Sequence, residues 1–217
     1  EWMITDLSDG WKQIGDDWYY VKDQSILKAQ WLILENAIYY LDEDGKMLEN
    51  EECLLEDITG DGSHVYHFGS GGALITGWYQ TSSGEWNYFD SNGLAVTGWL
   101  KLNTVWYYFS EDGVMATGWN EIDGTWYYFD VSGSMHTGWL QLNGIWYYMM
   151  PSGAMATGWA AADGNWYYFN ESGSMHTGWL QLGNNWYYLQ DSGNMVIGWQ
   201  VIDGVNYYFN ESGAWVS

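Results

Sequence analysis

A Gly-Trp pair returns every 20 residues through the second half of the chain. The copy at 98–117 reads G-W-L-K-L-N-T-V-W-Y-Y-F-S-E-D-G-V-M-A-T, and the later copies begin at Gly118, Gly138, Gly158, Gly178 and Gly198. A period this strict is typical of a linear array of small units, because each unit then packs on its neighbours and not around one shared core. We therefore expect a function that is carried out repeatedly along one surface.

Each unit contains two short runs of alternating residues around a turn. The runs W-L-K-L and V-W-Y-Y-F of the first regular 20-residue copy flank a two-residue turn, which is Asp-Gly or Asn-Gly in other copies, as at Asp123-Gly124. Such a dipeptide favours a type I′ hairpin turn. A later glycine, Gly113 in the first of these copies, is expected to be left-handed and to turn the chain into a connector. A lone hairpin is marginal in water, so the sequence predicts an all-β solenoid of stacked ~20-residue hairpins.

The quality of the repeat divides the chain near residue 76. Residues 1–76 carry degenerate copies and are a possible specialised N-terminal part, whereas residues 77–217 form a regular array. The unit at 198–217 has Asn206 in place of its second tryptophan, and we interpret it as a terminal cap. A finer alternation gives a period of 40 residues, which indicates either a duplicated unit or alternating environments along the array.

Composition narrows the class of ligand. The chain has 18 Trp and 19 Tyr but 6 Phe, and a formal net charge of −23. A surplus of Trp and Tyr suggests rings used at surfaces. The acidic balance argues against nucleic acid and against anionic membranes, since both attract Lys and Arg. It favours a cationic or neutral ligand, although a need for solubility would also explain it.

Other features exclude further classes. Cys53 is the one cysteine, so no intramolecular disulfide is expected. No apolar run reaches the length of a membrane span. The opening E-W-M-I-T-D lacks the basic segment of a signal peptide, so a secreted protein is expected in a mature or trimmed form. No catalytic motif is recognisable, no cofactor or metal is expected, and His136 and His176 are interpreted as surface residues.

A pair of tryptophans seven residues apart, or eight apart at Trp78 and Trp86, is the candidate binding element. Because strand residues alternate between two faces, Trp106 and Tyr108 share one face, which with Trp99 is expected to line the groove between successive hairpins. Tyr107 and Phe109 are expected on the packed side. Two tryptophans, a tyrosine from the next unit and a connector methionine would form an aromatic cage, whose preferred ligand is a quaternary ammonium held by cation–π attraction.

The unit G-W-x-x-x-x-G-x-W-Y-Y-F-x-x-x-G-x-M-x-T resembles the choline-binding repeats of pneumococcal and related Gram-positive surface proteins. The resemblance is close over 77–217 and loose over 10–76. It implies a left-handed β-solenoid in which two Trp of one hairpin and a Tyr of the next hold the choline of teichoic acids, with a contribution from Met or Leu.

The resemblance also implies which residues form the cages. The predicted cages are Trp78, Trp86 and Tyr108; Trp99, Trp106 and Tyr128; Trp119, Trp126 and Tyr148; Trp139, Trp146 and Tyr168; Trp159, Trp166 and Tyr188; and Trp179, Trp186 and Tyr208. A seventh is possible at Trp11, Trp18 and Tyr40. The predicted floor residues are Met115, Met135, Met155, Met175 and Met195. Trp31 faces Ile38 and not a second tryptophan, so no cage is expected there.

We therefore expect a non-catalytic module that binds choline or phosphocholine of teichoic or lipoteichoic acid and anchors a secreted surface protein or adhesin to the cell wall. Two alternatives stay open: a glucan- or carbohydrate-binding array, and the wall-binding part of a cell-wall hydrolase. A host protein is a further possible partner, and exposed terminal hairpins predict a possible homodimer. Neither nucleic acid nor membrane insertion is expected.

Overall fold

The computed structural model describes residues 4–58, 60 and 62–216, so the first three residues of the opening segment lie outside it. These residues form strands, turns and loops, and the described part of the chain contains no helix. They fall into two compact units, one of residues 1–100 with 109–115 and the other of residues 101–108 with 116–217. The division passes through the hairpin of β10 (Gly98–Leu102) and β11 (Val105–Phe109).

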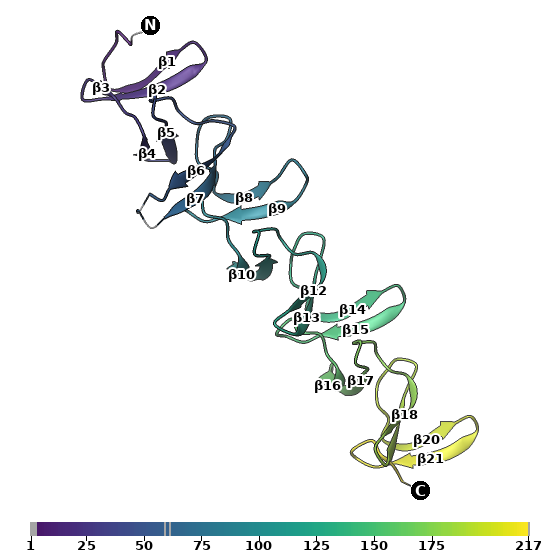
Figure 1. The fold of residues 1–217 in the computed structure, drawn as a ribbon. Helices are drawn as coiled ribbons and strands as arrows, with labels where there is room; N and C mark the ends of the chain where they lie inside the picture. Colours follow the sequence, from purple (N-terminus) through teal and green to yellow (C-terminus); the bar gives the residue numbers. More distant parts are fainter. Residues whose placement is uncertain (1–3, 59, 61, 217) are drawn as a thin grey trace. The chain divides into compact units, whose positions relative to one another are not determined.

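Every sheet is a hairpin, extended at two places by a third short strand (Figure 1). The strands of the first unit are β1 (Gly10–Ile14), β2 (Asp17–Lys22), β3 (Ser25–Ile26), β4 (Gln30–Leu34), β5 (Ala37–Leu41), β6 (Glu52–Glu56), β7 (Ser63–His67), β8 (Gly77–Gln80) and β9 (Trp86–Phe89). Those of the second are β12 (Gly118–Ile122), β13 (Thr125–Phe129), β14 (Gly138–Leu142), β15 (Ile145–Met149), β16 (Gly158–Ala162), β17 (Asn165–Phe169), β18 (Gly178–Leu182), β19 (Asn185–Leu189), β20 (Gly198–Ile202), β21 (Val205–Phe209) and β22 (Trp215–Val216).

The turns follow the prediction. Strands β12 and β13 pair antiparallel with Ile122 opposite Thr125, which leaves Asp123 and Gly124 as the two loop residues. Both have positive φ, 50° and 74°, as a type I′ turn requires. The glycine of the next turn is also left-handed, with a φ of 78° at Gly133. The all-β array of repeated hairpins is thus confirmed.

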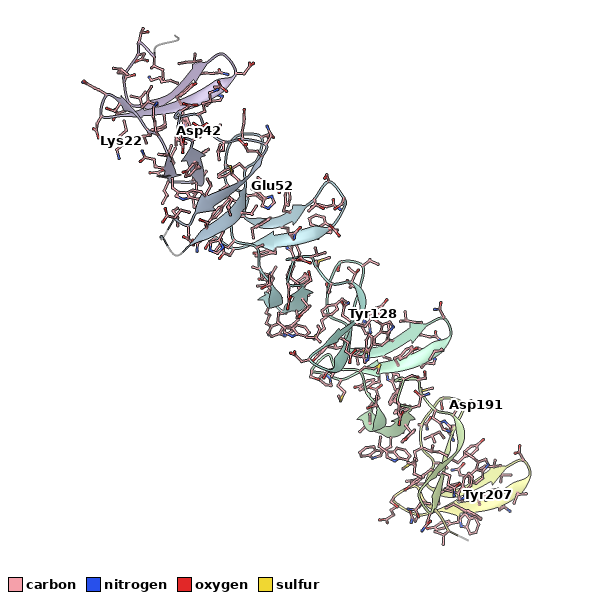
Figure 2. All side chains as sticks on the ribbon, in the orientation of Figure 1. Lys22, Asp42, Glu52, Tyr128, Asp191 and Tyr207 are labelled. Carbon is pink, nitrogen blue, oxygen red and sulfur yellow. The ribbon has the colours of Figure 1, made fainter. Side chains whose placement is uncertain are left out.

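Successive hairpins are joined by the connector that follows each one. Met155 forms a bridge with Met149 of its own hairpin, and its N–H donates to the carbonyl of Trp126 in the preceding hairpin at 2.8 Å. Met175 and Met195 make the same bond to the carbonyls of Trp146 and Trp166. Within each unit the stack is therefore held by single backbone hydrogen bonds at fixed points together with packed side chains, and Figure 2 shows the side chains that the hairpins carry.

The most deeply buried position of the second unit is one large side chain per hairpin. The final residue of each second strand has 0 % exposure, and these residues are Phe129, Met149, Phe169, Leu189 and Phe209. Burying a side chain of this size contributes roughly 1.5–3 kcal/mol. Because the buried position recurs every 20 residues, each level of the stack supplies its own small core.

The first unit departs from this regularity around β6 and β7. Leu48, Tyr66, Phe68 and Leu74 form a buried cluster there, against which Trp31 and five other partly buried apolar residues pack. The boundary expected near residue 76 falls inside this unit; as a division between degenerate and regular repeats it stays a prediction. None of the described segments forms a helix with the length and apolar character that a bilayer crossing requires.

Candidate functional site

The candidate site lies between two successive hairpins. In the register of β12 and β13, Trp119 stands opposite Tyr128 and Glu121 opposite Trp126, so both tryptophans occupy one face of the hairpin. The indole rings meet edge to face, with centroids 6.4 Å apart. The predicted Trp pair therefore forms two walls at right angles on a single face.

The next hairpin supplies a third ring and the floor. Tyr147 lies 5.1 Å from Trp119, again edge to face, and Met155 completes the lining of a cavity of about 370 Å³. Trp126 is 41 % exposed, whereas Trp119 is half-buried, so the first indole is held in the stack and the second stands open to solvent.

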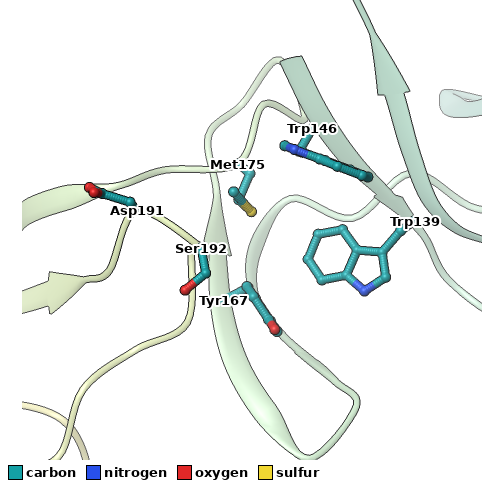
Figure 3. A pocket seen from close by; sticks show the side chains of 6 residues that line it. All are labelled: Trp139, Trp146, Tyr167, Met175, Asp191 and Ser192. Atoms are coloured by element: carbon teal, nitrogen blue, oxygen red, sulfur yellow. The ribbon is translucent and has the colours of Figure 1, made fainter. Parts of the chain in front are cut away.

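Three other cavities of 350–380 Å³ repeat this construction. Figure 3 shows the one of 380 Å³, where the rings of Trp139, Trp146 and Tyr167 and the thioether of Met175 surround one space. The remaining two are lined by Trp159, Trp166, Tyr187 and Met195, and by Trp11, Trp18, Tyr39 and Met47. In all three cavities of the second unit, the second tryptophan of the pair is 39–50 % exposed.

The structure differs from the prediction on which tyrosine lines the cavity. The cage at Trp119 was expected to take Tyr148, the second of its Tyr-Tyr pair, but the cavity is lined by Tyr147. Tyr148 lies against Trp139 of its own hairpin, at 5.1 Å. Alternation does place the second tyrosine on the face of the tryptophans. In a stack, however, that face meets the opposite face of the next hairpin, which carries the first tyrosine.

The same correction applies to the other predicted cages that lie within one compact unit. Each predicted tyrosine for which a contact is resolved lies against the first tryptophan of its own hairpin: Tyr40 with Trp31, Tyr128 with Trp119, Tyr168 with Trp159, Tyr188 with Trp179 and Tyr208 with Trp199, at 5.2–5.3 Å. The cavities and ring contacts are made instead by Tyr39, Tyr147, Tyr167, Tyr187 and Tyr207.

Three of the five predicted floor methionines line a cavity. Met155, Met175 and Met195 each follow one hairpin and line the cavity of the hairpin that precedes it. Met47, which was not among the predicted floor residues, does the same at Trp11. It was detectable from its spacing, because it follows Trp18 by 29 residues, as Met155 follows Trp126.

The turn after a third hairpin also contributes to each cavity, and the sequence did not indicate this contribution. Glu171 and Ser172, from the turn two hairpins further on, complete the lining at Trp119. Asp191 with Ser192 and Glu211 with Ser212 are the equivalent pairs. Figure 3 shows Asp191 at the outer edge with its carboxylate pointing away from the rings. Such a carboxylate adds negative potential at the entrance without contacting the space between the rings.

A glycine in this third turn allows its backbone to approach the methionine closely. Gly173 has a φ of 79°, and a Cβ added to it would overlap the sulfur of Met155. The same relationship joins Gly193 to Met175 and Gly213 to Met195. The turn therefore sits directly on the methionine that floors the cavity.

The site at Trp179 has a fourth ring. Trp179 contacts Trp186 at 6.1 Å and Tyr207 at 4.9 Å, as at the other sites. Trp215 pairs with Phe209 as the connector methionines pair with their own hairpins, and it lies 6.3 Å from Trp179. A tryptophan thus stands where the other sites have a methionine.

The position at Trp31 holds no open cage. Trp31 packs against Tyr66 at 4.7 Å, and its indole N–H donates to the carbonyl of Glu56. Ile38 and Cys53, which are partly buried, pack against the same apolar cluster as Trp31. The absence of a cage at Trp31, expected from Ile38, stays a prediction that this packing supports.

Two predicted cages have members in both compact units. Trp78 and Trp86 lie 6.2 Å apart in the first unit, and the N–H of Met115 donates to the carbonyl of Trp86. Their predicted partner Tyr108 belongs to the second unit. In the other cage, Trp106, Tyr128 and Met135 belong to the second unit and Trp99 belongs to the first. The structure does not place these members relative to one another, and the two cages stay predictions.

His136 and His176 are half-buried and not surface residues as expected. The Nε2 atom of His136 lies 3.0 Å from the carbonyl oxygen of Trp139, and that of His176 lies 3.0 Å from the carbonyl oxygen of Trp179. The missed signal is the position of each histidine three residues before the first tryptophan of a cage. Among the described residues, no group of three or more His, Cys, Asp or Glu side chains is arranged to hold a metal ion.

The sequence matches two protein-family models. The family model for the choline-binding repeat matches residues 96–136, 116–158 and 156–197. The family model for the cell wall binding repeat matches residues 9–24, 30–47, 76–95 and 197–214. Together they span most of the chain. No curated protein matches it.

Several solved structures are similar to the chain. CbpJ from Streptococcus pneumoniae TIGR4 is 31 % identical, with a TM-score of 0.66 over 96 % of this chain and 88 % of that one. Choline binding protein F from Streptococcus pneumoniae is 30 % identical, with a TM-score of 0.60 over 97 % and 93 %. It has also been solved with ipratropium and in the presence of a peptidoglycan analogue. The autolysin LytC of the same species is 27 % identical, with a TM-score of 0.57 over 95 % of this chain and 52 % of its own.

Proposed function

The chain belongs to the choline-binding repeat family of cell-wall-associated proteins, and from this membership we propose that its cavities hold the phosphocholine groups of teichoic or lipoteichoic acids. In this role the array anchors a secreted surface protein, such as an adhesin, to the cell wall.

One observation carries the proposal: each cavity combines three aromatic rings from two hairpins with a thioether floor. A quaternary ammonium has no N–H to donate, so it needs methyl burial and the negative faces of rings, and both are present. The acidic rim and the net charge of −23 add long-range attraction for a cation.

The strength of one cavity is modest. Three rings at roughly 1 kcal/mol each, with some methyl burial, correspond to a dissociation constant near 1 mM. A polymer carrying many phosphocholine groups would engage several cavities at once, and avidity would then rise by about 10²–10⁴. This gain supports the repetition of the site along the chain.

We assign no catalytic step to this chain. The autolysin LytC shows that arrays of this kind also occur in wall hydrolases, and this chain spans about half of that protein. The chain as it stands supports a binding role, whether it serves an adhesin or a hydrolase. Association into a homodimer through the terminal hairpins remains a proposal, which sedimentation with and without choline would decide.

Calorimetric titration with choline and with 3,3-dimethylbutan-1-ol tests the ligand class. The two molecules have the same shape, but the second carries no charge. The proposal predicts saturable millimolar binding of choline and at least tenfold weaker binding of the alcohol, because the cation–π contribution is lost. Equal binding of both would contradict the cation–π contribution, and retention on dextran but not on a choline matrix would favour the carbohydrate-binding alternative.

A further inference from the structure

We propose that His136 and His176 are positioning residues that order the first tryptophan of alternate cavities, so that the array contains two classes of choline site. The well-ordered class comprises the sites at Trp139 and Trp179, and the other class comprises those at Trp119 and Trp159. This inference rests on the proposed choline-binding function.

The hydrogen bond from each histidine reaches the backbone of the cage. A carbonyl oxygen only accepts, so the Nε2 atom of His136, 3.0 Å from the oxygen of Trp139, carries the proton and donates. Residues at the tryptophan positions turn their carbonyls away from the partner strand, as shown by the bond from Met175 to the carbonyl of Trp146. The histidine thus donates to a carbonyl that faces away from the partner strand. This bond fixes the backbone from which the first indole projects.

A second observation falls on the same two sites. Behind Trp139 lies the ring of Phe169, at 5.9 Å, and behind Trp179 lies the ring of Phe209, at 5.8 Å. Trp139 and Trp179 also pack against the two buried clusters of the second unit, which contain these phenylalanines. The indoles of this class are therefore held at the backbone by a hydrogen bond and at the ring by an aromatic core.

The sites at Trp119 and Trp159 have neither the histidine nor the phenylalanine in their sequence. Ala116 and Ala156 stand where the histidines would be, and a methyl group cannot donate a hydrogen bond. Met149 and Leu189 take the places of the two phenylalanines. Histidine and phenylalanine thus occur together at Trp139 and Trp179, which are 40 residues apart, whereas the position at Trp99 combines Phe129 with Val96.

Cavity size does not separate the sites at Trp119, Trp139 and Trp159, whose volumes are 370, 380 and 350 Å³. The indole N–H of Trp139 also donates to the carboxylate of Asp163 at 3.0 Å, a further bond to the same ring. What differs is how firmly the first indole is fixed before a ligand arrives. A wall that is already ordered loses less entropy on binding, and we expect choline to bind about three- to tenfold more tightly at Trp139 than at Trp119 or Trp159.

The test is a choline titration followed by ¹⁹F NMR of the protein labelled with 5-fluorotryptophan, which reports each site separately once its tryptophans are assigned. Two variants separate hydrogen bonding from packing. His136→Phe keeps a ring beside Tyr128, which His136 contacts at 6.2 Å, but removes the donor. His136→Gln keeps an N–H donor without the ring. Trp159 and Trp179 serve as internal controls.

The proposal predicts that His136→Phe weakens binding at Trp139 about three- to tenfold, leaves Trp159 and Trp179 unchanged, and is at least partly rescued by His136→Gln. Equal affinities at all sites in the wild type, or an unchanged Trp139 site in His136→Phe, would overturn it and leave the choline-binding function intact. Equal losses at all three sites would also overturn it, since they would show a general effect on folding. Failure of every site to respond to choline would instead refute the proposed function.

Discussion

Met155 donates its backbone N–H to the carbonyl of Trp126, 2.8 Å away, and its side chain floors the cavity that Trp126 walls. One residue thus makes both the bond that stacks two hairpins and a surface that a ligand would touch. The spacing of 29 residues between the two recurs from Trp18–Met47 to Trp166–Met195. The stacking of the repeats and the construction of the site are the same set of contacts.

The first prediction concerns the tyrosine of the cage. Tyr147→Leu should weaken choline binding at Trp119 about fivefold, because it removes one cation–π partner worth roughly 1 kcal/mol. Tyr148→Leu is the matched control, since Tyr148 lies against Trp139 and not in the Trp119 cavity. Site-resolved titration of both variants checks this. A loss at Trp119 in Tyr148→Leu alone would restore the assignment made from strand alternation.

The second prediction separates the two tryptophans of a cage. Trp146 is 39 % exposed, so Trp146→Ala should reduce choline binding at that cavity at least tenfold while changing the free energy of unfolding by about 1 kcal/mol or less. Trp139 packs on a buried cluster, so Trp139→Ala should lower both affinity and stability. Urea unfolding monitored beside the titration distinguishes them. Equal destabilisation by the two variants would contradict the division into a held wall and an open wall.

The third prediction tests the turn that rests on the methionine. Gly173 and Gly164 both have a φ of 79°, but only at Gly173 would a Cβ overlap Met155. Alanine at either position should cost roughly 1–3 kcal/mol through backbone strain. Gly173→Ala should cost a further 1–3 kcal/mol or so through overpacking, and should also weaken the Trp119 site. Thermal unfolding of the pair measures the difference, and equal costs would show that the contact with Met155 is unimportant.

The fourth prediction concerns pH and the first unit. Burial lowers the pKa of His67 below its usual value, although Glu52, whose Oε1 lies 3.2 Å from Nδ1, opposes the shift. The folded state therefore binds fewer protons than the unfolded state between the lowered pKa and about 6.5. Stability due to this residue should be present above that window and be lost as the pH falls through it.

His67→Leu removes this contribution while keeping an apolar side chain beside Phe89, which His67 contacts at 4.7 Å. The variant should show a shallower loss of stability between pH 7 and pH 5 than the wild type. Urea unfolding at several pH values gives the two slopes. Parallel slopes would mean that His67 titrates alike in both states.

Much of this fold was accessible from sequence because the hairpin signal is local. Asp123-Gly124 specifies its turn, and the separation of Trp119 from Trp126 places both on one face across that turn. The tyrosine was misassigned because alternation sorts the faces of a single strand but does not say which face of the next hairpin comes into contact. Tyr147 and Tyr148 are adjacent, and only the stacking distinguishes them.

The remaining site residues depend on longer-range geometry. Glu171 and Ser172 reach the Trp119 cavity from two hairpins away, and nothing in their own turn indicates it. His136 was interpreted as exposed because a single polar residue in a connector gives no sign of the carbonyl it will meet. A sequence period identifies equivalent residues, but contacts between different positions of the period require coordinates.

The most direct measurement is a crystal structure of the chain soaked in arsenocholine, whose arsenic marks each bound trimethyl group by anomalous scattering. The account predicts arsenic within the cavities, for example between Trp119, Trp126, Tyr147 and Met155, with its methyl groups against the three rings. Empty cavities at saturating ligand, or arsenic beside Trp119 and Trp126 that lies against Tyr148 and not against Tyr147, would contradict it.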